Sequence, residues 1–322
     1  MSVLDLNSKW ENVLYFKNKK GYNALRISAE CVPDLFIATN LDGYRCLLLF
    51  LQPNIEVKIK GSDKEKLSLA YLKNKNVIVI KLNDVDFIDL FNDLILSLYE
   101  KIKNINDAKK SSEELIYSFY KWADFFEDKL NTKLSIEEIK GLFGELFVLN
   151  ELLEDSYSIR VNSILESWKG PYDTTNDFVF DTKNIEVKTK EESKYYVKIS
   201  SEYQLEKEFD KGLELLIVSV NIDLINGESI HDLLNKIVKY LRINSGDASI
   251  LYKALNQKGL TLESVKQYNN HKFIVVKSDL YDCNLDDFPK LSVSNIPEEI
   301  TGLRYKLRVN TLSPFLIEGK KY

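Results

Sequence analysis

A short alternating segment near the middle of the chain constrains the fold more than any other feature. Residues 185–188 read Ile-Glu-Val-Lys, which is the pattern of a β-strand with one apolar face. A few residues earlier, the apolar run Phe178 to Phe180 follows Asp177 directly. We expect these two segments to form the strands of a hairpin, with residues 181–184 as its turn.

The hairpin would gather charged side chains. Alternate side chains of a strand share a face, so Glu186 and Lys188 point one way and Ile185 and Val187 point into the core. Across the hairpin, Asp177 and Glu186 would reach one cation. Carboxylates bind hard cations, and a lysine can orient water or stabilise charge on a phosphoryl oxygen. The alternative is that acids on exposed strands form ordinary ion pairs, because such a string also arises by chance.

A third acid lies on a predicted helix that begins at a capping pattern, Ser135 to Glu138, and runs to about residue 153. Glu145 falls within the apolar stripe of this helix, together with Leu142, Leu149 and Leu152. Gly141 and Gly144 weaken a helix, and their natural use is close approach to a neighbouring strand. Glu145 therefore either joins the acids of the hairpin or reaches the helix edge to pair with a lysine.

The order of these motifs resembles a bacterial family of PD-(D/E)XK motif proteins that is catalogued as a domain of unknown function. The resemblance covers about residues 135–205. It is carried by Gly-Leu-Phe-Gly-Glu-Leu at 141–146, Trp-Lys-Gly-Pro at 168–171, Asn-Asp-Phe at 176–178, Ile-Glu-Val-Lys at 185–188 and Gln-Leu at 204–205.

The resemblance implies an α/β (α+β) chain with a restriction-endonuclease-like mixed sheet flanked by helices. It also implies a DNA endonuclease in restriction or phage defence that leaves a 5′ phosphate, with methyltransferases and helicase-like proteins as candidate partners. By motif position, Asp177 and Glu186 are the metal-binding acids, Glu145 is an additional acid and Lys188 is the catalytic lysine. We expect Mg²⁺ as the cofactor, with Mn²⁺ as a substitute.

Several other residues near these motifs have expected roles, some of them with an alternative. Asp173 is a rival for the first acid, but it lies further from the apolar strand. Lys190 shares a face with Lys188 and either contacts DNA or is solvent-exposed. Gln204 either contacts DNA or belongs to a capping pattern that begins at Ser201. We expect Trp168 to anchor a loop, 162–175, to the core. Asn176 stands where the superfamily name has proline.

The pattern along the chain predicts two parts. Residues 1–105 form a β-rich N-terminal domain that ends in a helix, with strands at 24–27, 35–38, 44–51, 55–59 and 77–82. Residues 106–322 form the nuclease-like domain, with a motif core at 135–220 and an α/β extension at 221–322. We expect strands at 195–199, 213–220, 273–277 and 303–309, a short helix from about residue 201, and a helix around 233–241.

Composition limits the chemistry that is available. Two histidines and three cysteines are too few and too widely spaced for a zinc site or a disulfide framework, so we expect the cysteines to be buried in a reducing cytoplasm. The longest apolar runs are too short to span a membrane. The net charge of −5 argues against a uniformly basic DNA-binding surface. The lysines around the motif are interspersed with acids, which favours a solvated strand edge over a surface that binds phosphates. A non-catalytic subunit of a defence complex therefore stays open as an alternative function. A homodimer also stays open.

Overall fold

The computed structural model describes the chain except for residues 1–2, 14–20, 54, 56, 58, 60–61, 64–65, 127–132, 157–159 and 173. By contacts, the chain divides into two compact units: residues 1–129 with 247–249, and residues 130–246 with 250–322. This division lies after the boundary that the sequence places at 105–106, because α3 is grouped with the first unit. Both units combine helices with sheets, as expected for an α+β protein.

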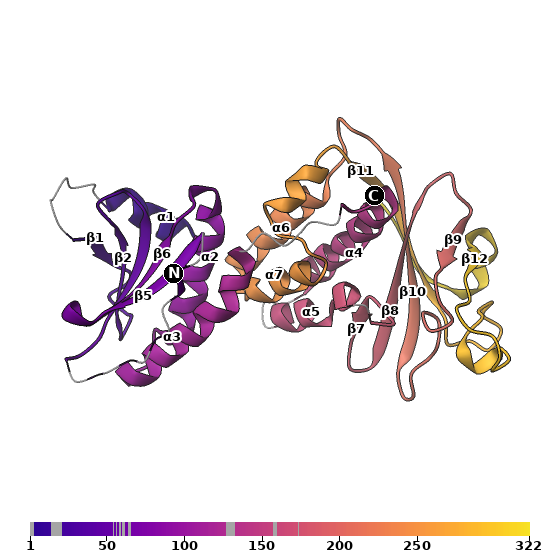
Figure 1. Cartoon of the computed structure of the whole chain (residues 1–322). Helices are drawn as coiled ribbons and strands as arrows, with labels where there is room; N and C mark the ends of the chain where they lie inside the picture. The colour runs from indigo at the N-terminus through magenta and orange to yellow at the C-terminus, as the bar shows by residue number, and fades with distance from the viewer. Residues whose placement is uncertain are drawn as a thin grey trace. The chain divides into compact units, whose positions relative to one another are not determined.

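The first unit is built on a six-stranded sheet in the order β1-β2-β3-β6-β5-β4, with every pairing antiparallel (Figure 1). The strands are β1 (Asn23–Arg26), β2 (Asp34–Thr39), β3 (Arg45–Phe50), β4 (Ser62–Asp63), β5 (Leu67–Leu72) and β6 (Val77–Leu82), and the helices are α1 (Val3–Asn12), α2 (Ile88–Ile102) and α3 (Ala108–Ala123).

The predicted strand at 55–59 is wrong for its described residues. Ile55, Val57 and Ile59 are irregular, while residues 56 and 58 lie outside the described part of the chain. Strand β5 is absent from the strands that the sequence predicts. Leu67 and Leu69 are buried in it but the exposed residue is the apolar Ala70, so its polar and apolar residues do not alternate clearly. Cys31, Cys46 and Cys283 are buried and free, as expected from their spacing.

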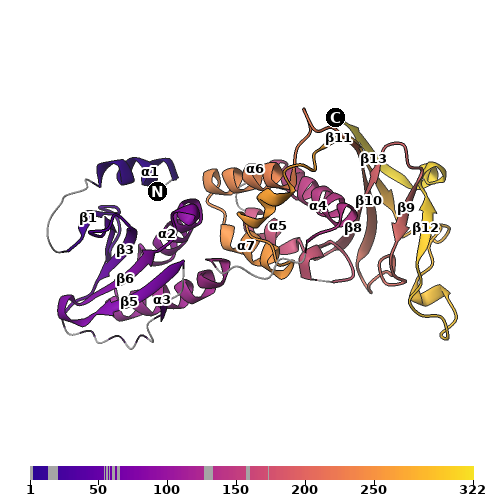
Figure 2. The same ribbon diagram turned by 45° about the horizontal axis from the view of Figure 1, so that its top comes forward.

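The second unit holds a five-stranded mixed sheet in the order β13-β11-β10-β8-β7 (Figure 2). The central pair β8–β10 is parallel, and the other pairings are antiparallel. A separate antiparallel ribbon joins β9 to β12. The strands are β7 (Phe178–Val179), β8 (Lys183–Glu191), β9 (Tyr196–Ile199), β10 (Gly212–Ile222), β11 (Phe273–Asp282), β12 (Tyr305–Arg308) and β13 (Leu316–Lys321).

The five-stranded sheet is covered on both faces. Helix α4 (Ile136–Glu154) lies on one side of it and the β9–β12 ribbon lies on the other (Figure 1). A Cβ atom on Gly144 of α4 would collide with the side chain of Thr189 of β8, whose own Cβ would be 3.1 Å away. Gly144 therefore allows the close approach of helix and strand that the sequence predicts. Gly141 does not, because no atom lies within 4 Å of its Cβ position. The remaining helices are α5 (Val161–Ser167), α6 (Ile230–Ile243) and α7 (Ala248–Gln257).

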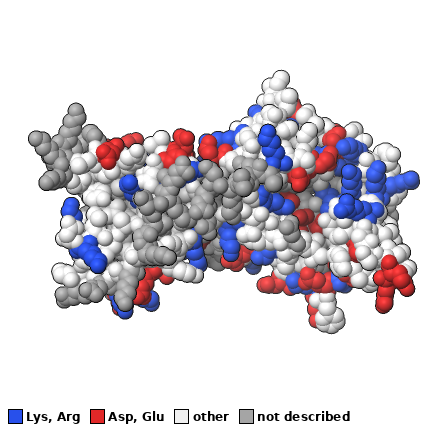
Figure 3. All heavy atoms as spheres, viewed as in Figure 1, with Lys and Arg blue, Asp and Glu red and all other residues white. Residues whose placement is uncertain are grey.

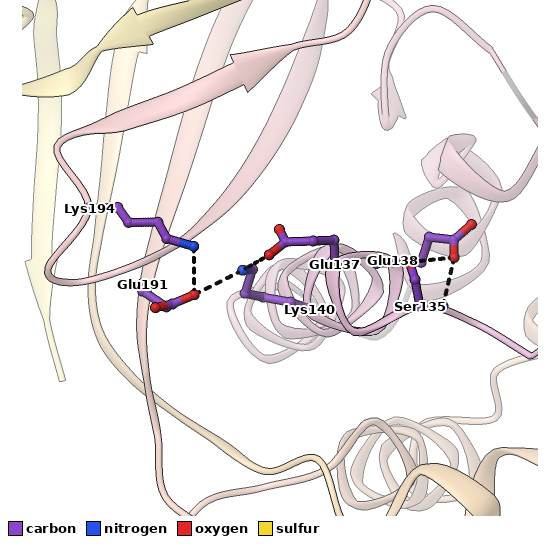
Figure 4. Close-up of polar contacts among 6 residues, drawn as sticks. All are labelled: Ser135, Glu137, Glu138, Lys140, Glu191 and Lys194. Atoms are coloured by element: carbon purple, nitrogen blue, oxygen red, sulfur yellow. Dashed lines mark hydrogen bonds and ion pairs between the residues drawn. The ribbon is translucent and has the colours of Figure 1, made fainter.

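The N-terminus of α4 is fixed by polar contacts that Figure 4 shows together. Ser135 and Glu138 form the predicted capping box. The buried Lys140 Nζ contacts Glu137 Oε1 at 2.8 Å and Glu191 Oε1, at the end of β8, at 3.3 Å. Because a buried ammonium needs paired charge, this network ties the first turns of α4 to the sheet.

Two local predictions in this unit are wrong. The segment predicted as a loop from residue 162 contains α5, a helix whose buried residues Val161, Ile164 and Leu165 follow helical spacing over only two turns. The segment from Ser201 forms turns instead of a short helix. None of the helices in the described residues is both long and apolar enough to cross a bilayer.

Candidate active site

The hairpin predicted from the sequence is present, and it places Asp177 against β8. Phe178 lies opposite Ile185, so β7 and β8 pair with Asp177 immediately before the paired residues. Beyond that pairing, Oδ2 of Asp177 accepts a hydrogen bond from the backbone N–H of Val187 at 2.7 Å. Its own carbonyl accepts the N–H groups of Lys169 and Gly170 at 2.7 and 3.0 Å. One backbone contact therefore holds the carboxylate of Asp177, and two others hold its main chain.

Glu186 and Lys188 share a face of β8, as their spacing predicts. Lys188 Nζ donates to Glu186 Oε1 at 2.6 Å. The second oxygen of Glu186 accepts a long hydrogen bond, 3.4 Å, from Nδ2 of the buried Asn176. The same amide nitrogen donates to the backbone carbonyl of Gln204 at 2.9 Å. Asn176 thus connects the second acid to the turn that follows β9.

Glu145 joins the same site from α4. Its Oε2 accepts a hydrogen bond from the indole Nε1 of Trp168 at 2.9 Å. The Cβ position of Gly170 lies against Glu145 Oε2 and 2.9 Å from Asp177 Oδ1, so both carboxylates project toward the space that a larger residue would fill. Trp168 is buried as predicted, and in addition it holds a site residue.

The acids of this site resist ionisation. Burial, followed by the charge of Asp177, raises the pKa of Glu145 to about 8. Glu145 keeps some surface exposure, but protein atoms surround its carboxylate. Burial and then Asp177 likewise raise the pKa of Glu186 to about 8, and burial raises the pKa of Asp177. For Lys188, burial opposes the charge, yet Glu186 and Asp177 outweigh it and raise the pKa.

This geometry accompanies a match to a known family. A model described as "Putative PD-(D/E)XK family member" and as a domain of unknown function, DUF4420, matches residues 6–310. The chain belongs to the DUF4420 family. The match spans both compact units, and PD-(D/E)XK proteins in general are nucleases that use divalent metals. Comparisons with curated proteins and with solved structures give no match.

One charge that acts on the site of this DUF4420 protein escapes sequence reasoning altogether. Lys258 follows α7, far along the chain from the motif, yet its charge lowers the pKa of both Glu145 and Asp177. Those effects are smaller than the effect of burial. No motif or periodicity links Lys258 to the hairpin, because only tertiary packing brings its charge close enough to act on these acids. Lys258 therefore adds positive charge to the surroundings of the site.

The secondary predictions have mixed outcomes. Lys190 is buried, with Nζ donating to the carbonyls of Glu191 and Glu192 at 3.3 and 3.2 Å, so the solvent-exposed alternative is wrong. Oε1 of Gln204 accepts the N–H of Ser200 at 2.8 Å within a turn, so no helix is capped there. Contact of either residue with DNA stays a prediction. Asp173 lies outside the described residues.

The donor set suits a hard divalent cation. All three acids offer only oxygen ligands, which favours Mg²⁺ or Mn²⁺ over softer metals. Burial, and then the charge of Asp177, raises the pKa of Glu145 and of Glu186, and a bound cation would oppose both effects by favouring the ionised carboxylates. Within the described residues, no three His, Cys, Asp or Glu side chains converge as a ready-made metal cluster. In this arrangement, Oε1 of Glu186 accepts a hydrogen bond from Lys188.

Proposed function

We propose that this PD-(D/E)XK protein is a Mg²⁺-dependent DNA endonuclease. The observation that carries the proposal is the cluster of Glu145, Asp177, Glu186 and Lys188, which three rigid elements hold in a largely buried site. Acids with raised pKa values beside a lysine are typical of a catalytic centre and are costly in a purely structural role. The family match supports the same assignment at a coarser level.

Each residue has a distinct role in the proposed reaction. Asp177 and Glu186 would hold Mg²⁺, with Glu145 as an additional ligand or supporting acid. When bound, the ion supplies positive charge for phosphoryl transfer. Lys188 orients the attacking water and stabilises negative charge on a phosphoryl oxygen. Water adds to phosphorus, the bond to the 3′ oxygen breaks, and the 3′ oxygen takes up a proton, which leaves a 5′ phosphate.

Plasmid cleavage tests this function. Purified protein should nick or linearise supercoiled plasmid with Mg²⁺ or Mn²⁺ and leave it intact with EDTA. Cleavage that persists in EDTA would contradict the proposed metal dependence. No cleavage under any metal condition, with a folded protein that still binds DNA, would point to the second candidate below.

A second candidate is a DNA- or protein-binding subunit that a partner activates. It is favoured by the ion pair at 2.6 Å between Lys188 and Glu186, which occupies one of the proposed metal ligands. Adding partner proteins from the same defence system, such as a methyltransferase or a helicase-like protein, should then switch on cleavage. The endonuclease proposal includes a setting, which is restriction or phage defence in the cytoplasm. It also includes a homodimer that cuts both strands.

A further inference from the structure

The β9–β12 ribbon has one apolar face and one basic face. Val197, Ile199 and Leu307 are buried on the inner face, in a cluster with Leu215 and Ile217 of β10. The outer face carries three exposed cations: Lys198, Lys306 and Arg308. Figure 3 shows Lys and Arg side chains gathered over the region of this ribbon.

The arrangement of these cations is unfavourable for the ribbon itself. Lys198 and Lys306 are directly opposite each other, and like charges in that position destabilise a strand pair. Among the residues that the structure describes, no acid forms an ion pair with Lys198, Lys306 or Arg308. The charge of Lys198 contributes only a minor part of the lowered pKa of Glu137, which falls mainly through its hydrogen bond from Lys140. The outer face therefore holds uncompensated positive charge in an acidic protein.

An aromatic side chain supports the same face. The Nζ of Lys306 lies 4.4 Å from the centroid of the Tyr196 ring, which steadies the ammonium without neutralising it. Arg308 is opposite Tyr196 in the register, so Tyr196 has a second cation as its cross-strand neighbour. Neighbouring Tyr195 is 63% exposed. Cations interleaved with aromatic rings suit phosphate and sugar contacts of a nucleic acid.

The ribbon lies next to the candidate active site. Its inner face packs on Leu215 and Ile217, which are opposite Glu186 and Lys188 in the sheet register. After β9 the chain turns through Gln204, whose carbonyl accepts the Asn176 amide that also contacts Glu186. The ribbon thus covers the face of the sheet on which Glu186 and Lys188 lie, and a duplex bound on its outer face would lie on that side of the sheet.

We propose that the outer face of the β9–β12 ribbon binds the phosphate backbone of duplex DNA through Lys198, Lys306 and Arg308. This rests on the proposed endonuclease function and deepens it by placing the substrate contact. Phosphate neutralisation provides much of the affinity of such interfaces, and a two-stranded ribbon fits against the duplex grooves. The net charge of −5 is no obstacle, because the unpaired cations are concentrated on one element.

Binding measured without metal tests the ribbon independently of cleavage. Fluorescence anisotropy in EDTA, with a fluorescein-labelled duplex and a series of KCl concentrations, would compare the parent with the triple variant Lys198→Gln, Lys306→Gln and Arg308→Gln. The variant should bind about tenfold or more weakly, with a salt slope that is smaller by about 0.9 for each lost phosphate contact. A matched control, Lys110→Gln, Lys121→Gln and Lys239→Gln, removes the same charge from α3 and α6 and should bind like the parent.

A charge reversal separates folding from binding. Lys306→Glu places a carboxylate opposite Lys198, so it should preserve or raise the Tm while weakening duplex binding more than Lys306→Gln does. Unchanged affinity and salt slope in the triple variant, or an equal loss in the matched control, would overturn the proposal. So would a triple variant that keeps duplex binding and loses only binding to anionic lipid vesicles. An inactive Lys188→Ala protein that still binds duplex through the ribbon would leave this inference standing.

Discussion

The indole of Trp168 donates its hydrogen bond to Glu145 at 2.9 Å across 23 positions of sequence. This contact lowers the pKa of Glu145 against the opposing effects of burial and Asp177. We therefore expect Trp168→Phe to raise that pKa further and to move the onset of metal-dependent cleavage to higher pH, measured as a pH–rate profile. The lost buried hydrogen bond should also cost about 1–3 kcal/mol of stability.

Trp10→Phe is a matched control for that variant. It removes the indole hydrogen bond, 2.9 Å, from Trp10 to the buried Asn92 in the first unit. A similar loss of stability is expected, without a shift of the pH–rate profile. If both variants shift the profile equally, the effect is a general one of instability and Trp168 has no special relation to Glu145.

The buried acids make stability depend on pH in an unusual direction. Because the folded pKa values of Glu145 and Glu186, about 8, exceed the ordinary value of 4.5, folding favours the protonated forms. In EDTA, the free energy of unfolding should be highest at acidic pH and fall from about pH 5 to pH 8, by up to about 1.4 kcal/mol per pH unit for each group. Urea unfolding at several pH values measures this fall.

Neutral replacements isolate that effect. Glu145→Gln or Glu186→Gln should flatten the decline and stabilise the metal-free protein near pH 8, whereas the exposed Glu113→Gln should leave the decline unchanged. A decline that is equally steep in the Glu145→Gln variant would show that Glu145 is ionised in the folded protein.

Cleavage should depend steeply on Lys188. Lys188→Ala removes the ammonium that lies 2.6 Å from Glu186, and a loss of about 10²-fold or more in the cleavage rate is expected if it stabilises the transition state. Asp177→Asn should act similarly with the fold kept, as monitored by circular dichroism. Lys194→Gln, which removes only the ion pair with Glu191, serves as the control. Full activity in either site variant removes the proposed mechanism.

The two glycines of α4 should respond in opposite ways to alanine. Gly144→Ala forces a Cβ into Thr189 of β8 and should cost about 1–3 kcal/mol by overpacking. Gly141→Ala meets no atom within 4 Å and should stabilise the helix by about 0.5–1 kcal/mol. Thermal unfolding of both variants measures the contrast in stability. Equal changes in Tm would contradict the close contact between Gly144 of α4 and Thr189 of β8.

Local patterns predict the parts of the site that lie within single elements. The alternation around Glu186 indicates the shared face with Lys188, and the apolar stripe of α4 places Glu145 inward. The hairpin follows from two strands and a short turn. Each of these predictions needs only the periodicity of one element or the pairing of two neighbours in sequence.

Contacts between distant segments could not be predicted in the same way. Lys258 and the Asn176 link to Gln204 depend on tertiary packing. Strand β13 is exposed along its whole length, so it has no apolar alternation and is fixed by backbone pairing with β11. Helix α5 is too short for its stripe to stand out from a loop.

The hydrogen bond from Val187 to the side chain of Asp177 has a consequence beyond the reaction. Strand β7 ends after two residues, so most of the outer edge of β8 lacks a strand neighbour from β7, and Asp177 satisfies one of its amides. Unpaired strand edges recruit other chains and promote aggregation. The proposed metal-binding acid thus also satisfies a backbone amide at this edge. Because an asparagine can accept the same hydrogen bond, we expect Asp177→Asn to aggregate less than Asp177→Ala when inactive protein is prepared for DNA complexes.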